Sequence, residues 1–258
     1  MFDIEKLKNQ IDQFKIDSNS VRDIITPFLN DELKSAKTIE LFHLGKFLYK
    51  LREKYIINSL SESPDFIIEN ECKNVGVEIV SIYTKIVEVE KFKQQLLKFS
   101  EKKFIEKYPD INFFASVYFK DKELKLQKHQ LFEEAEKIAD YIYNIYKQQN
   151  LTYVSETIKE VEFINSSQLS FSYNPGGYMV NNLTPELVIS TISKKEKKII
   201  TYKQRNLDEI WLLIVVSQSS PESYEIFEED EHLFKNFDSK FDKIYILEDF
   251  KMEIYCLK

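Results

Sequence analysis

Two carboxylates lie in short apolar segments of the chain, where a charged group is costly to bury. Asp65 opens the apolar stretch 66–68, and Glu78 is at the centre of the stretch 75–83. A buried carboxylate without a partner is strongly destabilising. If the two stretches pair as an antiparallel hairpin through residues 69–74, the carboxylates approach each other and repel unless a cation lies between them.

A hard divalent cation is the natural occupant of such a carboxylate pair. Mg²⁺ or Mn²⁺ prefers oxygen ligands and keeps part of its water shell. An ion of this kind activates water and neutralises charge that develops on a phosphate. The alternative is that Asp65 faces solvent in a turn and that Glu78 pairs with one of the lysines. The spacing alone favours neither interpretation.

The elements that must position these carboxylates alternate between helix and strand. Residues 1–60 are predicted to be helical, since apolar residues recur at helical spacing, and 58–64 is predicted to be a break rich in turn formers. The other predicted helices cover residues 85–107, 131–146 and 184–202, and the other predicted strands cover 111–119, 161–164, 169–173, 209–217, 243–247 and 253–257. This alternation predicts an α/β fold with a mixed central sheet covered by helices on both faces.

Length and composition favour one domain. The 258 residues are 43% hydrophobic, enough for one sizeable core. We expect a helical part over 1–60, a core motif region over 61–120, and a C-terminal helix and strands over 185–258 that complete the sheet. The longest apolar run, Ile210–Val216, is too short to span a membrane, and the first ten residues lack a secretory signal, so we expect a cytoplasmic protein.

The hairpin motif resembles a known nuclease superfamily. Pro64-Asp65, followed thirteen residues later by Glu78 in a Gly-Val-Glu-Ile-Val strand, is similar to the PD-(D/E)xK nucleases, which have the restriction-endonuclease-like fold. That family has an N-terminal helix with a Glu, a hairpin with the Asp and a Glu-x-Lys, then a helix and a strand, and it cleaves DNA with Mg²⁺. The order and spacing match over about residues 35–120.

A second resemblance lies downstream and concerns the family's lysine. The lysine belongs two residues after the Glu, where this chain has Val80. The pattern Ile192-x-x-Lys195-x-x-Lys198-x-x-x-Tyr202, followed by the strand of Trp211, is similar to a bacterial subset of the superfamily. A lysine matters because it orients the attacking water and stabilises charge on the phosphate. Lys195 and Lys198 share a helix face with Tyr202, so they are the favoured replacements.

The sequence offers alternatives for both the lysine and the glutamate. Lys85 and Lys91 are the other candidates for the lysine. For the glutamate of the N-terminal helix, Glu40 is preferred over Glu53. His43, three residues after Glu40, is expected at the surface or the edge of the core.

The resemblance implies a metal-dependent phosphodiesterase, an endonuclease that hydrolyses DNA. Asp65, Glu78 and the carbonyl of Ile79 would bind Mg²⁺ or Mn²⁺, and Lys195 would position the water. A net charge of −7 argues against indiscriminate binding to phosphate polymers, yet residues 194–205 form a local basic run. The expected partner is nucleic acid, with DNA favoured, and a homodimer is not excluded.

Two further hypotheses compete with this reading. Without a lysine at position 80, the chain could be an inactive relative that serves as a nucleic-acid-binding or protein-interaction module. The acidic segment 222–230 could cover a basic groove or dock a partner.

Overall fold

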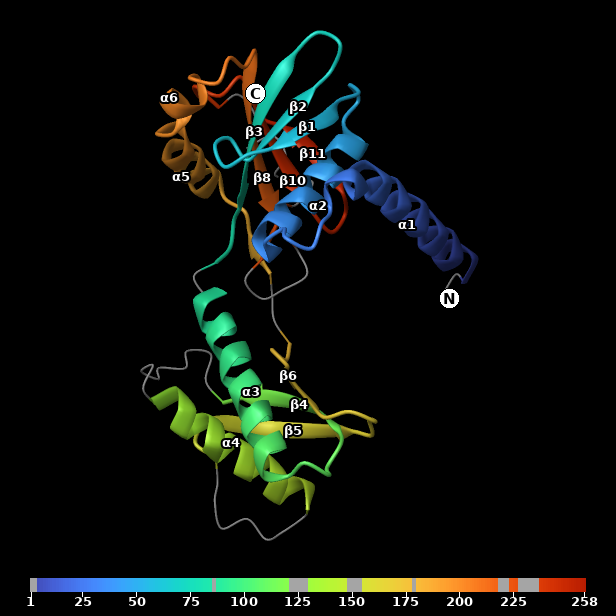
Figure 1. The fold of residues 1–258 in the computed structure, drawn as a ribbon, viewed down its shortest axis with the longest axis vertical. Helices are drawn as coiled ribbons and strands as arrows, with labels where there is room; N and C mark the ends of the chain where they lie inside the picture. Colours follow the sequence, from blue (N-terminus) through green and yellow to red (C-terminus); the bar gives the residue numbers. More distant parts are fainter. Residues whose placement is uncertain are drawn as a thin grey trace. The chain divides into compact units, whose positions relative to one another are not determined.

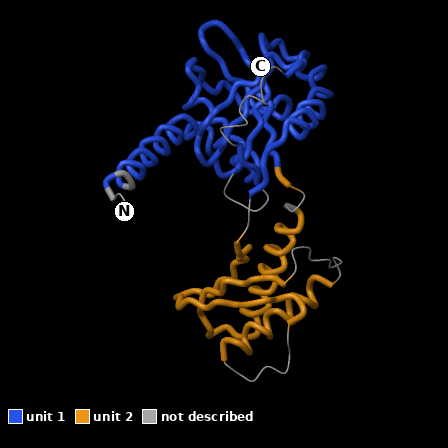
Figure 2. Tube along the Cα trace, turned by 180° about the vertical axis from the view of Figure 1, so that it is seen from behind, with its two compact units in different colours: residues 1–82, 180–258 blue, residues 83–179 orange. Residues whose placement is uncertain are grey.

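The chain forms two compact units. The computed structural model describes residues 4–84, 87–120, 130–147, 155–177, 180–217, 223–226 and 237–258. Unit 1 comprises residues 1–82 and 180–258, and unit 2 comprises residues 83–179 (Figure 2). We expected a single domain over 1–258. The chain divides because residues 83–179 build a sheet and a hydrophobic core of their own.

Unit 1 is built on a mixed sheet, which has six strands among the described residues (Figure 1). In spatial order the strands are β1 (Ile56–Leu60), β2 (Phe66–Glu69), β3 (Asn74–Ser81), β8 (Glu209–Val216), β10 (Lys243–Glu248) and β11 (Glu253–Cys256). Strands β3, β8 and β10 are parallel to one another, whereas β1, β2 and β11 pair antiparallel with their neighbours. The predicted mixed central sheet is confirmed.

Helices cover both faces of this sheet. On one face lie α1 (Ile4–Ile25), the short 3₁₀ helix η1 (Thr26–Phe28) and α2 (Ser35–Lys50); on the other lie α5 (Pro185–Glu196) and α6 (Ile199–Tyr202). Strand β8 supplies Trp211 and Leu213 to the first core, and Leu212 and Ile214 to the second. Its continuous apolar sequence is therefore explained by burial on both faces.

The predicted hairpin is confirmed, and the segment before it differs from expectation. Strands β2 and β3 pair antiparallel, with Ile67 opposite Gly76. Residues 56–60, predicted to belong to a helical part and a break, form strand β1 instead. Its Ile57 is buried in the core, and a shift of register between Ile57 and Ser59 accommodates the polar Asn58.

The predicted helix over 184–202 is interrupted. Thr184 caps α5 by accepting a hydrogen bond from the amide of Leu187, as the Thr-Pro sequence predicted. α5 ends at Glu196, and α6 begins at Ile199, which is buried. A short two-stranded sheet in the same unit joins β7 (Asn181–Asn182) to β9 (Tyr224–Glu225).

Unit 2 is a small α/β unit. It contains α3 (Val87–Lys107), β4 (Phe114–Phe119), α4 (Leu131–Tyr146), β5 (Ile158–Ile164) and β6 (Ser170–Tyr173), and its strands lie in the order β5-β4-β6. The core motif region expected over 61–120 included the helix and strand that follow the hairpin. They form unit 2 instead, and the parallel neighbour of β3 is β8.

The core of unit 2 lies between its sheet and its two helices. Leu96 and Phe104 of α3 and Ile138 of α4 pack with Ala115 and Val117 of β4.

None of the described helices is both long and apolar enough to cross a membrane.

Candidate functional site

The hairpin register brings Asp65 and Glu78 together. Phe66 lies opposite Val77, and continuing this register by one residue places Asp65, just before β2, opposite Glu78, whose charge acts on the Asp65 carboxyl group. Residues directly opposite each other on antiparallel strands point to the same face. The Oδ2 atom of Asp65 also accepts a hydrogen bond of 2.7 Å from the amide of Ile79, which holds the carboxylate against β3. The two acidic side chains therefore converge.

Pro64 and Gly76 set this geometry. A Cβ on Gly76 would lie 2.6 Å from Cγ of Pro64 and 2.7 Å from Cδ1 of Leu207, closer than real atoms approach. The residue before Asp65 thus packs directly on the backbone of β3. Glycine is required here by the close approach of Pro64, because no larger residue leaves room for the ring.

Gly76→Ala is expected to destabilise the protein by about 1–3 kcal/mol, because the rigid Pro64 ring cannot move aside as a flexible side chain would. Urea unfolding measures this loss. Gly177→Ala is the control, since a Cβ at Gly177 meets nothing within 4 Å. Equal stability of the two variants would contradict the close packing of Pro64 on β3.

Glu78 is buried and receives a lysine from α5. Val77 and Ile79, the residues on either side of Glu78, belong to the core beneath α2. Successive side chains of a strand point to opposite faces, so Glu78 faces the layer formed by α5 and α6. Only 1% of Glu78 is exposed. The Nζ atom of Lys195 lies 2.7 Å from Oε1 of Glu78 and 3.5 Å from the carbonyl oxygen of Ile79. Lys198 approaches the same Oε1 atom at 3.5 Å.

Two polar atoms at this position, Oε2 of Glu78 and the hydroxyl of Tyr202, are buried and make no hydrogen bond of regular geometry to the described residues, although the two side chains interact with each other. Burial raises the pKa of Tyr202, and the Glu78 side chain, through hydrogen bonding and charge, and the Asp65 carboxylate act in the same direction. Lys195, Lys198 and Tyr202 all lie beside Glu78, but they do not share one continuous helix as predicted: Lys195 is on α5, Lys198 precedes α6 and Tyr202 ends α6.

The Asp65 carboxyl group carries the electrostatic strain of the site. Burial raises its pKa to about 6, and repulsion from Glu78 and Glu40 contributes in the same direction. The amide of Ile79 and the ammonium of Lys37 oppose this rise. The ordinary value is 3.8, so ionising Asp65 is costly while the site holds only the protein's own charges.

Lys37 is a site residue that the sequence analysis missed. Its Nζ atom lies 3.0 Å from Oε2 of Glu40 and 3.5 Å from Oδ1 of Asp65, and it stands over the ring of Phe66 at 4.4 Å. Only 14% of the Lys37 side chain is exposed. The i,i+3 spacing of Lys37 and Glu40 on a predicted helix was the available signal. Lys37 contacts both Glu40 and Asp65 and so links Glu40 to the site.

The other N-terminal candidates lie elsewhere. Glu53 follows α2 in a loop and accepts a hydrogen bond from the hydroxyl of Tyr55, so it is not part of the carboxylate cluster. His43 is buried at the edge of the core, with Nδ1 2.9 Å from Oδ1 of Asp249. Lys46 binds the same carboxylate at 2.8 Å.

The structure describes one of the two alternative lysines and part of the acidic segment. Lys91 is exposed on α3 of unit 2, and Lys85 lies outside the described residues. Of the acidic segment 222–230, the structure describes residues 223–226.

The donor set suits a weakly held Mg²⁺ ion. In the described part of the chain, no three or more His, Cys, Asp or Glu side chains are grouped so that they could hold a metal ion. The oxygens of Asp65, Glu78 and the Ile79 carbonyl remain, and Oε2 of Glu78 makes no hydrogen bond of regular geometry to the described residues. Mg²⁺ is commonly held by one or two carboxylates and several waters, so these residues fit it.

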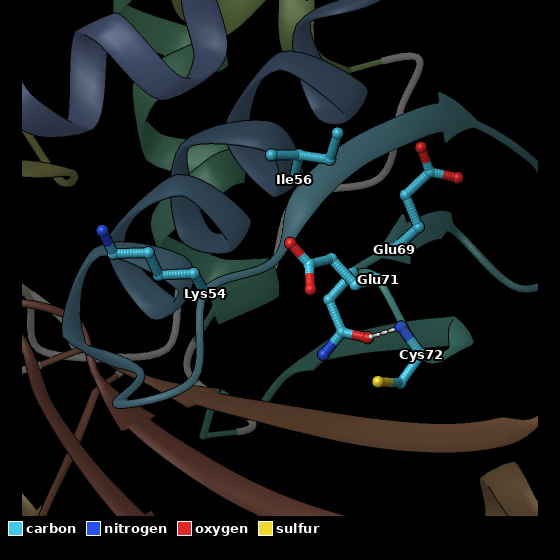
Figure 3. A pocket seen from close by; sticks show the side chains of 6 residues that line it. Lys54, Ile56, Glu69, Glu71 and Cys72 are labelled. Carbon is cyan, nitrogen blue, oxygen red and sulfur yellow. Dashed lines mark hydrogen bonds between the residues drawn. The ribbon is translucent and has the colours of Figure 1, made fainter.

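A surface hollow of about 560 Å³ lies at the far end of the hairpin (Figure 3). It is lined by Lys54, Ile56, Glu69, Asn70, Glu71 and Cys72. The Asn70 side chain accepts a hydrogen bond of 3.0 Å from the amide of Cys72 and shapes the turn between β2 and β3. Asp65 and Glu78 lie at the opposite, open end of the hairpin, so this hollow is separate from the carboxylate cluster.

Comparisons of the chain with protein-family models, with curated proteins and with solved structures gave no significant match. The geometry of the site is therefore the evidence for function.

Proposed function

We propose that this protein is a metal-dependent phosphodiesterase, an endonuclease of the restriction-endonuclease-like fold that hydrolyses DNA. The observation that carries the proposal is that Asp65, just before β2, and Glu78 of β3 lie close together, with the amine of Lys195 in contact with Glu78. Paired carboxylates with a lysine at hydrogen-bonding distance are the groups that metal-assisted phosphate hydrolysis requires.

Each residue has a role in this proposal. Asp65, Glu78 and the Ile79 carbonyl hold Mg²⁺ or Mn²⁺, and Glu40 supports them through Lys37. The bound ion supplies Lewis acidity for water and phosphate. Lys195 takes the place of the lysine that the resemblance expects at position 80, where the chain has Val80. Lys195 belongs to α5, and its ammonium group contacts the carboxylate of Glu78, which is on β3, the strand that contains Val80.

The basic run over 194–205 provides a surface for the phosphate backbone. Lys194, Lys197, Lys198, Lys203 and Arg205 are exposed on or beside α5 and α6, the helices that bring Lys195 to Glu78. Cationic side chains beside the carboxylate pair favour binding of a phosphate polymer despite the overall negative charge. This placement supports nucleic acid as the substrate class.

Asp65→Ala and Glu78→Ala are each expected to reduce cleavage of plasmid DNA in Mg²⁺ to the background rate, because each removes a proposed ligand. Nicked and linear products are measured on agarose gels. Glu71→Ala, at the exposed turn of the same hairpin, is the matched control and should cut as the parent does. If both variants at 65 and 78 cut at the parental rate, the proposal is wrong.

Because position 80 is Val and not Lys, a second candidate function is that of an inactive relative that binds nucleic acid or a protein. The parent chain would then retain DNA in a filter-binding assay and show no cleavage with Mg²⁺ or Mn²⁺. The contact between Lys195 and Glu78 favours the enzyme, since it provides an amine beside the carboxylates although position 80 has no lysine.

A further inference from the structure

Lys195 contacts the same oxygens that the proposed function assigns to the metal ion. Its ammonium lies 2.7 Å from Oε1 of Glu78 and 3.5 Å from the carbonyl oxygen of Ile79. The side chain is 22% exposed, so it reaches the site from a partly open position. A divalent cation and an ammonium repel each other strongly at such separations. They cannot both make close contact with these two oxygens.

The charge balance of the site also predicts that an ammonium group leaves when a divalent cation binds. The carboxylates and ammonium groups of the cluster are equal in number: Glu40, Asp65 and Glu78 with Lys37, Lys195 and Lys198. A divalent cation added to this balanced set creates an excess of positive charge, and one ammonium group is then repelled from it.

Lys195 is the group whose departure frees the proposed ligands. Lys37 pairs with Glu40 and Asp65 and touches neither Glu78 nor Ile79 in the contacts described. Lys198 is farther from Glu78, at 3.5 Å, and 57% of its side chain is already exposed. Only the Lys195 ammonium, among these three, bridges the Glu78 carboxylate and the Ile79 carbonyl.

We propose that Lys195 has two working positions. Without a divalent cation, its ammonium neutralises Glu78 and closes the ligand set. When the ion binds, Lys195 leaves Glu78 and becomes available to the substrate phosphate. Metal loading therefore releases the lysine that hydrolysis needs, and the protein is not poised to cleave before the ion has bound. This inference rests on the proposed function.

The test is Mn²⁺ binding by the full-length chain, followed from the electron paramagnetic resonance signal of free Mn²⁺. Lys195→Met should bind the ion more tightly, on the order of tenfold, because the competing ammonium is gone. Lys197→Met is the control, since it removes the same charge from an exposed neighbouring position that does not touch Glu78. Its affinity should stay within about twofold of the parent, as expected for a screened surface charge.

Two further variants separate failure of this inference from failure of the proposed function. Asp65→Asn and Glu78→Gln should weaken Mn²⁺ binding in either case if the ion occupies this site. If they do so while Lys195→Met binds no tighter than Lys197→Met, the displacement of Lys195 is refuted and the metal site stands. If neither carboxylate variant weakens binding, the metal site itself is refuted.

A second measurement does not depend on the folding of a variant. In the parent labelled with [ε-¹³C]lysine, the resonance assigned to Lys195 should move on addition of Mg²⁺, whereas that of Lys37 should move less. A Lys195 resonance that stays in place at saturating Mg²⁺ would overturn the proposal.

Discussion

Lys195→Met is expected to lower the free energy of unfolding of the metal-free protein by about 3–5 kcal/mol, because it removes the close partner of a buried charge. Glu78 is 1% exposed, and its Oε1 atom lies 2.7 Å from the Lys195 ammonium. The remaining contact, with Lys198 at 3.5 Å, is longer and involves a largely exposed side chain. Urea unfolding in the presence of EDTA measures the loss.

A double-mutant cycle identifies the cause. With Glu78→Gln in the background, Lys195→Met should cost much less, since no buried charge is left without its partner. Added Mg²⁺ should stabilise Lys195→Met more than it stabilises the parent, because the ion replaces the missing cation. A loss of stability that is the same in both backgrounds would show that Lys195 acts by packing and that its charge is unimportant.

The sequence was most informative where the chemistry is local. The hairpin followed from two short apolar segments around a polar turn, and the observed register then places Asp65 opposite Glu78. Helical spacing predicted that Lys195, Lys198 and Tyr202 lie together, and the structure brings all three to Glu78, although the helix is broken between Lys195 and Tyr202. Short-range periodicity is sufficient for such predictions because it fixes which side chains share a face.

Features that depend on long-range pairing were not predictable in this way. Lys37 meets Asp65 only because α2 packs beside the start of β2, 28 residues further along the chain. One domain was expected over the whole chain, but the strand that pairs with β3 is β8, which follows the whole of unit 2 in the sequence. Strand β1 contains Asn58 and Ser59, which resemble a turn in sequence and are accommodated by an irregular register.

Asp65→Asn is expected to stabilise the metal-free protein at neutral pH while it abolishes metal binding. The pKa of Asp65 is raised by burial from 3.8 to about 6, so the folded protein holds this proton more tightly than the unfolded chain. The ionised form therefore costs stability above pH 6, by about 3 kcal/mol for a shift of this size. An amide carries no charge and can still accept the hydrogen bond from Ile79.

The sign of the pH dependence makes this prediction specific. Between pH 3.8 and about 6 the folded state binds more protons than the unfolded state, so the stability of the parent attributable to Asp65 falls as pH rises. Asp65→Asn should lack this fall: its advantage should be absent at the acidic end and complete above pH 6. Asp31→Asn, at an exposed position of the same unit, should follow the parent.

Urea unfolding across this pH range, with EDTA present, measures the difference between Asp65→Asn and the parent. A carboxylate that lowers folding stability is expected where it binds a cation, because binding of the ion offsets that loss. Mg²⁺ should accordingly stabilise the parent and leave Asp65→Asn unchanged. If the variant is instead less stable than the parent at every pH, Asp65 is a structural residue held by Lys37 and Ile79, and its charge is not strained.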